Sequence, residues 1–281
     1  MYIFIFVRGY EQDKKNQHAV MKEINKKKWY KFPFFSNMYY FAVLTVKWAT
    51  TGKKAFRYYA MERLGNMFNP HFRFTEFGQV WRDDKKFEDY YVGFEGNNYH
   101  SIDRKYTVNQ FLQLIKNVQG DTVECGSYKG ATSYLICTFI QQHKQSKQHH
   151  IFDSFEGLSK PGQEDGIYWK EGDLTTGEEI CRNNLSTFSF VKYYKGWIPN
   201  RFQEVKELQF SFVHIDVDIY QPTLDSISFF YERLNKGGII ICDDYGFSSC
   251  PGAKKAMDDF FKEKPEMVIM LTTGQSFIIK A

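Results

Sequence analysis

Short apolar runs alternate with amphipathic segments from about residue 100 onwards, and this alternation constrains the fold more than any other feature of the chain. Strands that alternate with helices pair in parallel through right-handed crossovers. The sequence therefore predicts an α/β fold with a doubly wound, mostly parallel sheet. The expected strands are 121–125, 150–153, 190–194, 210–215 and 239–242, and the expected helices are 107–118, 132–142, 178–185, one with Pro222 at its first position that ends at Gly237-Gly238, and 251–262.

The two ends of this region carry further signals. Thr107 and Gln110 have the spacing of a capping box, so the first helix is expected to begin at Thr107. No helix separates the last two apolar runs, 267–271 and 276–279, so they should form an antiparallel pair at the edge of the sheet. Ligands of such sheets bind beyond the carboxyl ends of the strands. Polar residues at those ends are therefore the candidate functional residues.

The first two strands end in motifs that suit a cofactor. Gly126 and Gly130 enclose a turn into a helix, where the lack of side chains lets a ligand approach the backbone. This turn is neither the G-x-G-x-x-G motif of dinucleotide enzymes nor a Walker motif. Asp153, at the end of the second strand, is placed to bind ribose hydroxyls. A plain tight turn and an aspartate that caps its own loop remain alternatives for the two motifs.

The most informative residues follow the last two parallel strands. Asp216 and Asp218 end the fourth strand, and Asp243 and Asp244 end the fifth. Carboxylates that converge on neighbouring strands, about 5 Å apart, repel one another unless a cation is bound. An oxygen-only ligand set suits Mg²⁺, Ca²⁺ or Mn²⁺ rather than zinc. Solvated loop aspartates are the alternative interpretation.

Several separate motifs together resemble the macrocin O-methyltransferase family, of the TylF, MycF and NovP type. The resemblance covers about residues 100–281 and does not extend over the first ninety. Its motifs are Glu124-Cys125-Gly126 with Lys129-Gly130, Asp153-Ser154-Phe155-Glu156-Gly157, Lys195-Gly196-Trp197, His214-Ile215-Asp216-Val217-Asp218-Ile219-Tyr220 with Pro222-Thr223, and Gly237-Gly238 followed by Asp243-Asp244-Tyr245.

The resemblance implies a class I methyltransferase fold, with a Rossmann-like sheet and a mainly helical N-terminal segment. It implies a metal-dependent sugar O-methyltransferase that uses S-adenosylmethionine and Mg²⁺, or another divalent cation, on a glycan, a nucleotide sugar or a glycosylated natural product. Asp216, Asp243 and Asp244 would bind the metal, and Asp218 would be the general base, so Asp216 and Asp218 are the catalytic pair. The cofactor would contact Glu124, Gly126, Ser127, Gly130, Asp153, Ser154, Gly196 and Trp197.

Physical chemistry also favours a metal, since a cation beside a sugar hydroxyl lowers its pKa and fixes the direction of attack. His214 is an alternative base, although we favour a buried structural histidine because it lies inside a strand. Methylation of a catechol-like phenol is the alternative activity. The D-x-D-x-Y-x-x-T pattern favours sugars.

The basic charge of the chain is concentrated near its N-terminus. The net charge is +4, but residues 1–60 hold twelve Lys and Arg against three acidic residues, which gives +9 there and leaves −5 for the remainder. We divide the chain into a basic, aromatic-rich segment at 1–95, part lid or dimerisation element, and a methyltransferase domain at 96–281. A solvated basic face is favoured over a nucleic-acid-binding protein, because motifs of nucleic-acid modifiers are absent. Peripheral membrane contact through 1–60 is not favoured.

The remaining expectations concern location and assembly. Five cysteines without C-x-x-C spacing suit reduced thiols in a cytoplasmic protein. The runs 1–7 and 32–49 are too short or too interrupted to span a membrane, and the second is expected to be a helix packed on the body or on a second subunit. Residues 70–106, with Tyr99, His100 and Arg104, are expected to form part of a lid that a homodimer partner completes.

Overall fold

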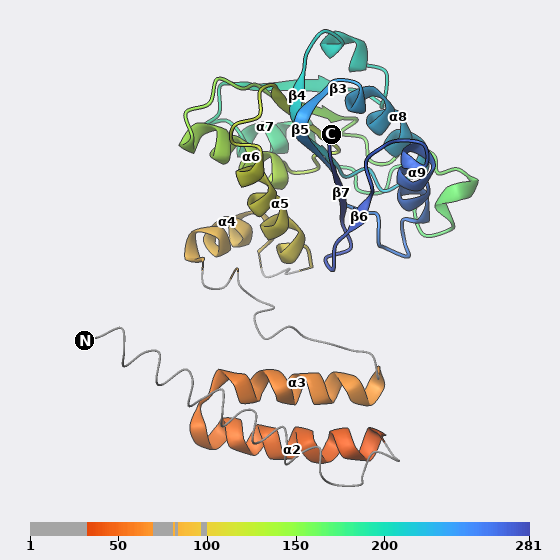
Figure 1. Ribbon diagram of the computed structural model, residues 1–281. Helices are drawn as coiled ribbons and strands as arrows, with labels where there is room; N and C mark the ends of the chain where they lie inside the picture. The colour runs from red at the N-terminus through yellow and green to blue at the C-terminus, as the bar shows by residue number, and fades with distance from the viewer. Residues whose placement is uncertain (1–32, 70–80, 82–83, 97–99) are drawn as a thin grey trace. The chain divides into compact units, whose positions relative to one another are not determined.

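The structure is a computed structural model that describes residues 33–69, 81, 84–96 and 100–281 (Figure 1). The chain divides into two compact units between residues 80 and 81. Helix α4, at Lys85–Glu95, therefore belongs with the second unit. The expectations for residues 1–7, and for residues 70–80, 82–83 and 97–99 of the lid, Tyr99 included, lie outside the described residues.

The described residues of the first unit form a pair of helices that pack side by side, α2 (Pro33–Thr51) and α3 (Lys54–Phe68) (Figure 1). Gly52, with φ +66°, makes the turn between them. Leu44 and Ala60 are buried. The apolar run that begins at residue 32 is thus largely helical, as expected, and it packs against α3. Among the described residues, no helix has the length and apolar character needed to cross a membrane.

The second unit is built on a seven-stranded sheet with the order β3-β2-β1-β4-β5-β7-β6. The first five strands in the chain pair in parallel, and β7 pairs antiparallel with both β5 and β6. This confirms the predicted mostly parallel sheet with an antiparallel C-terminal edge. The strands are β1 (Asp121–Cys125), β2 (His149–Asp153), β3 (Val191–Lys195), β4 (Phe210–Ile215), β5 (Leu234–Cys242), β6 (Ile269–Met270) and β7 (Ser276–Ile279).

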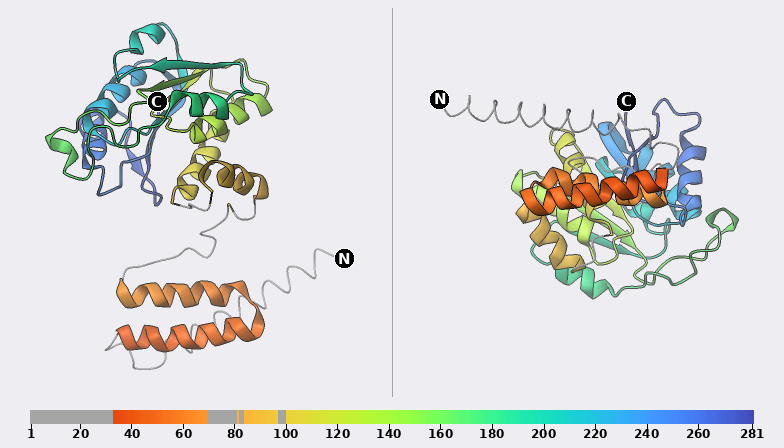
Figure 2. Two further views of the ribbon diagram at one scale, coloured as in Figure 1. Left: turned by 180° about the vertical axis from the view of Figure 1, so that it is seen from behind. Right: turned by 90° about the horizontal axis from the view of Figure 1, so that it is seen from below.

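Helices cover both faces of the sheet (Figures 1 and 2). On one face lie α4, α5 (Ile102–Leu114) and α6 (Ala131–Gln142), whose apolar side chains form a core with Phe212, Ile239 and Ile241 of the sheet. On the other face, α8 (Tyr220–Tyr231) and α9 (Pro251–Phe261) pack on Val213, Ile215 and Ile240. Helix α7 (Glu178–Asn184) packs against α6 and β2 through Cys181. The sheet is thus buried between two apolar layers, as a doubly wound fold requires.

Three local predictions were wrong. Helix α5 begins at Ile102 rather than Thr107, whose hydroxyl donates to the Asp103 carbonyl inside the helix instead of capping it. Gly237 and Gly238 lie within β5, because α8 ends earlier, at Tyr231. Pro222 is the third residue of α8 rather than its first, a place it tolerates because the first-turn N–H groups have no partner inside the helix.

The strand register brings the functional motifs to one edge. Cys125 pairs with Ile215, and Ile215 pairs with Cys242, so the last residues of β1, β4 and β5 lie side by side. Gly126 follows β1, Asp216 follows β4 and Asp243 follows β5. The backbone N–H of Asp216 donates to the Cys125 carbonyl, and that of Asp243 donates to the Ile215 carbonyl. The sheet therefore fixes the backbones of these positions against one another.

Candidate active site

A cleft of about 270 Å³ lies at the carboxyl ends of the parallel strands. Its walls come from the segments that follow β1, β2, β3 and β4, and from the beginning of α5. Gly126, Ser127, Asp153, Ser154 and Trp197, all predicted to contact a cofactor, line it, together with Asp216 and Asp218. Glu124, Gly130, Gly196, Asp243 and Asp244 are not among its lining residues.

Gly126 has no room for a side chain. Its φ is +81°, and a Cβ at this position would lie 1.9 Å from the backbone oxygen of Asp216. The turn after β1 therefore presses directly on the segment that carries the acidic residues. Only glycine allows both the backbone conformation and this close approach.

Asp153 holds the same turn in place. One carboxylate oxygen accepts hydrogen bonds from the backbone N–H groups of Ser127 (2.7 Å) and Tyr128 (3.0 Å), and the other accepts one from Phe155 (2.7 Å). Because each oxygen can accept two hydrogen bonds, Asp153 retains part of its acceptor capacity while it links the ends of β1 and β2.

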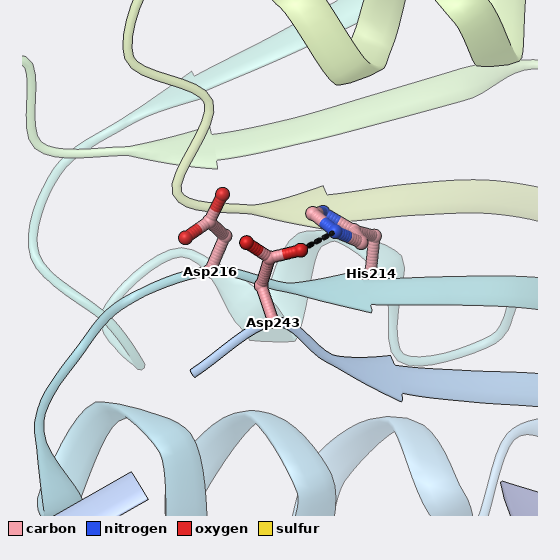
Figure 3. Close-up of side chains that lie close together, drawn as sticks. All are labelled: His214, Asp216 and Asp243. Atoms are coloured by element: carbon pink, nitrogen blue, oxygen red, sulfur yellow. Dashed lines mark hydrogen bonds and ion pairs between the residues drawn. The ribbon is translucent and has the colours of Figure 1, made fainter. Parts of the chain in front are cut away.

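Asp216 and Asp243 lie next to each other with His214 behind them (Figure 3). His214 is fully buried and bridges two acids: its Nδ1 lies 3.0 Å from Glu124 Oε1, and its Nε2 lies 3.3 Å from Asp243 Oδ1. Burial alone would lower the pKa of His214, but the bonds to Asp243 and Glu124 raise it to about 9. At neutral pH the imidazole is therefore a cation with both nitrogens protonated, which makes it neither a metal ligand nor a base.

Asp243 is the most heavily bonded acid of the site. Its Oδ1 accepts from Gln275 Nε2 (2.6 Å) as well as from His214, and its Oδ2 pairs with the guanidinium of Arg104. Burial opposes ionisation, yet the charges of Arg104 and Lys105 and the bond from His214 hold the pKa of Asp243 well below its usual range. Asp243 is thus a permanent anion.

Lys105 is the second cation that α5 brings to the site. Its Nζ lies 3.5 Å from Asp216 Oδ2, and its side chain lines the cleft although it is largely buried. Burial would lower the pKa of Lys105, but the charges of Asp243 and Asp216 raise it above its ordinary value. Lys105 therefore stays charged beside Asp216.

Asp218 and Asp244 form a second acidic pair, next to Cys250. The Asp244 carboxylate accepts from the backbone N–H of Asp218 (3.0 Å), and the Cys250 thiol donates to Asp218 Oδ1 (3.4 Å). Burial, and then the charge of Asp216, raises the pKa of Asp218 to about 7. Burial and the charges of Asp218 and Asp216 raise the pKa of Asp244 well above its usual range.

Glu124 lies behind the cleft in a buried polar chain. The Ser133 hydroxyl donates to Glu124 Oε2, and it also contacts His149 Nε2 (2.8 Å). His149 Nδ1 in turn lies 2.9 Å from the Thr122 hydroxyl. Burial lowers the pKa of His149 to about 4, so this imidazole is neutral. Glu124 thus connects the sheet interior to His214 rather than facing the cleft.

The predicted metal ligands are divided between the two acidic groups, with Asp216 and Asp243 in one and Asp244 in the other. Sequence reasoning named Arg104 only as part of a lid and missed Lys105, Gln275 and Cys250. A helical period would have found Lys105, because it shares the buried face of α5 with Ile102, Val108 and Leu112. No such signal marks Gln275, which reaches Asp243 from the turn before β7.

The five cysteines, Cys125, Cys137, Cys181, Cys242 and Cys250, are free and buried. Cys250 alone of the five touches a candidate catalytic residue among the hydrogen bonds recorded for the described part of the chain. Burial raises the pKa of its thiol to about 12, so the group is a neutral donor rather than a nucleophile.

NovP and CalS11 are among the solved structures that share this fold. The O-methyltransferase NovP is 22% identical, with a TM-score of 0.56 over 68% of this chain and 88% of that one. The calicheamicin methyltransferase CalS11 is 14% identical, with a TM-score of 0.58 over 74% of this chain and 94% of that one. Both likenesses concern the fold, which is the Rossmann-like fold of class I methyltransferases.

Related sequences belong to named O-methyltransferases. The chain is 27% identical over 174 residues to demethyldecarbamoylnovobiocin O-methyltransferase of Streptomyces niveus. This match covers 57% of this chain and 65% of that protein. It is 26% identical over 152 residues to 8-demethyl-8-(2,3-dimethoxy-alpha-L-rhamnosyl)-tetracenomycin-C 4'-O-methyltransferase of Streptomyces olivaceus, over 50% of this chain and 58% of that protein. Either match spans less than two thirds of the relative's length. The profile of the macrocin-O-methyltransferase (TylF) family matches residues 105–270, which is more than half of the chain, and the protein therefore belongs to this family.

Proposed function

We propose that the protein is an S-adenosylmethionine-dependent O-methyltransferase that methylates a sugar hydroxyl with the help of a divalent cation. Membership of the family supports methyl transfer to oxygen. The name of one relative specifies a rhamnosyl acceptor, which supports a deoxysugar on a glycosylated small molecule as the substrate class.

We infer that the cleft holds S-adenosylmethionine. Gly126, Ser127, Asp153, Ser154 and Trp197 would hold the cofactor, since they line the cleft at the ends of β1, β2 and β3. Gly126 supports this assignment. The turn has no space for a Cβ, and without a side chain a ligand can approach the Gly126 backbone closely. Glu124, Gly130 and Gly196 would act from outside the lining. The two glycines would shape the turns that surround the cofactor, and Glu124 would act through its bonds to Ser133 and His214.

The charge balance of the site is the observation that carries the metal. Five carboxyl groups, of Glu124, Asp216, Asp218, Asp243 and Asp244, face three cations, Arg104, Lys105 and His214. With all five carboxyl groups ionised the site would carry an excess of two negative charges, which equals the charge of one divalent cation. It appears in the structure as the raised pKa values of Asp216, Asp218 and Asp244, for which burial and the neighbouring carboxylates are responsible.

The donor set is therefore suited to Mg²⁺ or Mn²⁺, and Asp216, Asp243 and Asp244 would hold the ion. When bound, a divalent cation supplies a positive charge that lowers the pKa of a hydroxyl group beside it. A cation at this position would also relieve the repulsion that raises the pKa of Asp244.

Asp218 is suited to take the proton of the acceptor hydroxyl. Asp218 lines the cleft, and burial together with the charge of Asp216 raises its pKa toward the range in which a general base works at neutral pH. Cys250 donates a hydrogen bond to Oδ1, which leaves Oδ2 for the substrate. The positive φ of Asp218, +61°, sets the direction of this side chain relative to Asp216.

The acceptor class is tested with the purified full chain, S-adenosylmethionine and Mg²⁺. TDP-rhamnose, a rhamnosylated aromatic glycoside and catechol are offered separately, and products are analysed by mass spectrometry. We expect a gain of one methyl group on a sugar and none on catechol. Methylation of catechol alone would contradict the sugar assignment and support the phenol alternative.

We also propose a cytoplasmic homodimer. The five free, buried cysteines support a reducing compartment. Light scattering of the full chain at micromolar concentration tests the dimer, and a monomeric mass would contradict it. Fractionation of cells that express the protein tests the location, which recovery outside the cytoplasmic fraction would contradict.

A further inference from the structure

We propose that Arg104 competes with the divalent cation for Asp243, so that the metal binds as Arg104 is released. The inference rests on the metal role in the proposed function. It concerns a residue just outside the stretch that matches the family profile, which begins at residue 105.

The bonds of Asp243 leave one oxygen for a metal. Oδ1 accepts from both Gln275 and His214, which fills its two lone-pair positions. Oδ2 is the oxygen that Arg104 holds. A cation that used Asp243 would therefore bind at Oδ2 and meet the guanidinium group there. Two cations cannot share this oxygen without strong repulsion.

Arg104 is held less completely than the other partners of Asp243. Its buried Nε has no hydrogen-bond partner in the described structure, although the guanidinium also makes a cation–π contact 5.0 Å from the centre of the Phe247 ring. Its side chain keeps 20% of its exposure, whereas His214 has none. Arg104 also lies in the first turn of α5. It is thus the partner of Asp243 that can leave at the lowest cost.

Lys105 does not have the same effect. Its Nζ lies 3.5 Å from Asp216, beyond a normal hydrogen bond, and the other lone pairs of that half-buried carboxylate stay accessible. If the metal and Arg104 compete for Asp243, only one of them can contact its Oδ2 at a time. By linkage, the ion pair lowers the affinity for the metal by the same factor by which the metal weakens the ion pair.

The test is direct titration of the metal-stripped full chain with Mn²⁺, in which free Mn²⁺ is followed by electron paramagnetic resonance without any turnover. Arg104→Met removes the charge and keeps much of the side-chain volume. Arg182→Met is the matched control, because Arg182 is an exposed arginine on α7 whose ion pair is with Glu178 and not with Asp216, Asp218, Asp243 or Asp244. We expect Mn²⁺ to bind Arg104→Met on the order of tenfold more tightly than the wild type. The control should match the wild type.

A second variant guards against a folding defect. Arg104→Gln also removes the charge and should bind Mn²⁺ more tightly than the wild type, with folding of all variants verified by circular dichroism. Equal or weaker binding by the folded charge-free variants would overturn the competition and leave the metal role intact. No Mn²⁺ binding by any of the proteins would overturn both, and methylation that persists after chelation would identify the metal role as the failed step.

Discussion

Arg104, in the first turn of α5, forms an ion pair with Asp243, which follows β5 and lies 139 residues further along the chain. The contact joins the beginning of the helical layer to the acidic edge of the sheet. His214 and Gln275 bond to the other oxygen of the same carboxylate. Asp243 is therefore part of the fold as much as part of the candidate metal site, which separates it from Asp216.

Substitution of Asp243 should destabilise the protein far more than substitution of Asp216. Asp243→Asn removes the charged partner of the half-buried Arg104 and one of the two acids that pair with the buried His214, a loss of about 3 kcal/mol. Asp216→Asn should cost about 1 kcal/mol or less, because it also removes the repulsion between Asp216 and Asp218. Urea unfolding of the metal-free variants measures both. Equal losses would contradict the structural role of Asp243, and Asp216→Asn is the better variant for activity assays.

Substitution of Asp218 should affect the chemical step and spare the cofactor. Asp218→Asn removes the group that takes the proton, so kcat should fall by a factor of about 10² to 10⁴. Calorimetric titration with S-adenosylhomocysteine should give an unchanged affinity, since the backbone N–H of residue 218 can still bond to Asp244. The control is Asp258→Asn, because Asp258 is an exposed aspartate on α9 that pairs with Lys254. A normal kcat for Asp218→Asn would show that Asp218 is not the general base.

Gly126 and Gly172 form a matched pair of glycines. Their φ values are +81° and +83°, but a Cβ would lie 1.9 Å from the Asp216 backbone oxygen at Gly126 and would meet nothing within 4 Å at Gly172. Gly172→Ala should therefore cost about 1 kcal/mol for the backbone conformation alone. Gly126→Ala should cost at least about 3 kcal/mol and abolish S-adenosylhomocysteine binding. Similar unfolding free energies for the two variants would refute the close approach after β1.

His149 should make the protein less stable in mild acid. Its pKa is about 4 in the folded state because it is buried, against 6.5 for an ordinary histidine. Below pH 6.5 the unfolded chain takes up a proton that the folded chain refuses, so stability falls as the pH drops from 6.5 to about 4, by up to about 3 kcal/mol. Urea unfolding at pH 7 and pH 5 should show a smaller loss for His149→Gln than for the wild type. An identical loss would exclude His149 as the cause.

The sheet and its functional edge were largely predictable from the sequence. Apolar runs such as 210–215 and 239–242 stand out because strands buried on both faces are almost continuously apolar. The two motifs Asp216-Val217-Asp218 and Asp243-Asp244 follow such runs, so parallel pairing alone brings them to one edge. This is why residues from distant segments could be assigned to a single site.

The partners of those acids could not be predicted in the same way. Arg104 and Gln275 reach Asp243 from α5 and from the turn before β7, and these contacts depend on packing rather than on strand order. The sequence predicted that α5 begins at Thr107, so Arg104 and Lys105 were placed outside the helix. Because the helix begins at Ile102, both residues lie on it. Glu124 follows the same logic, since its position in β1 was correct while its side chain bonds to Ser133 and His214 behind the cleft.

We propose above that the protein transfers methyl groups with the help of a divalent cation held at the acidic edge of the sheet. The most direct measurement is the rate of methylation of the acceptor found in the panel, after the full chain has been stripped with EDTA and desalted. We predict loss of activity on stripping and its recovery on addition of Mg²⁺ or Mn²⁺, with no recovery for Asp216→Asn. Undiminished methylation by the stripped protein would contradict the account.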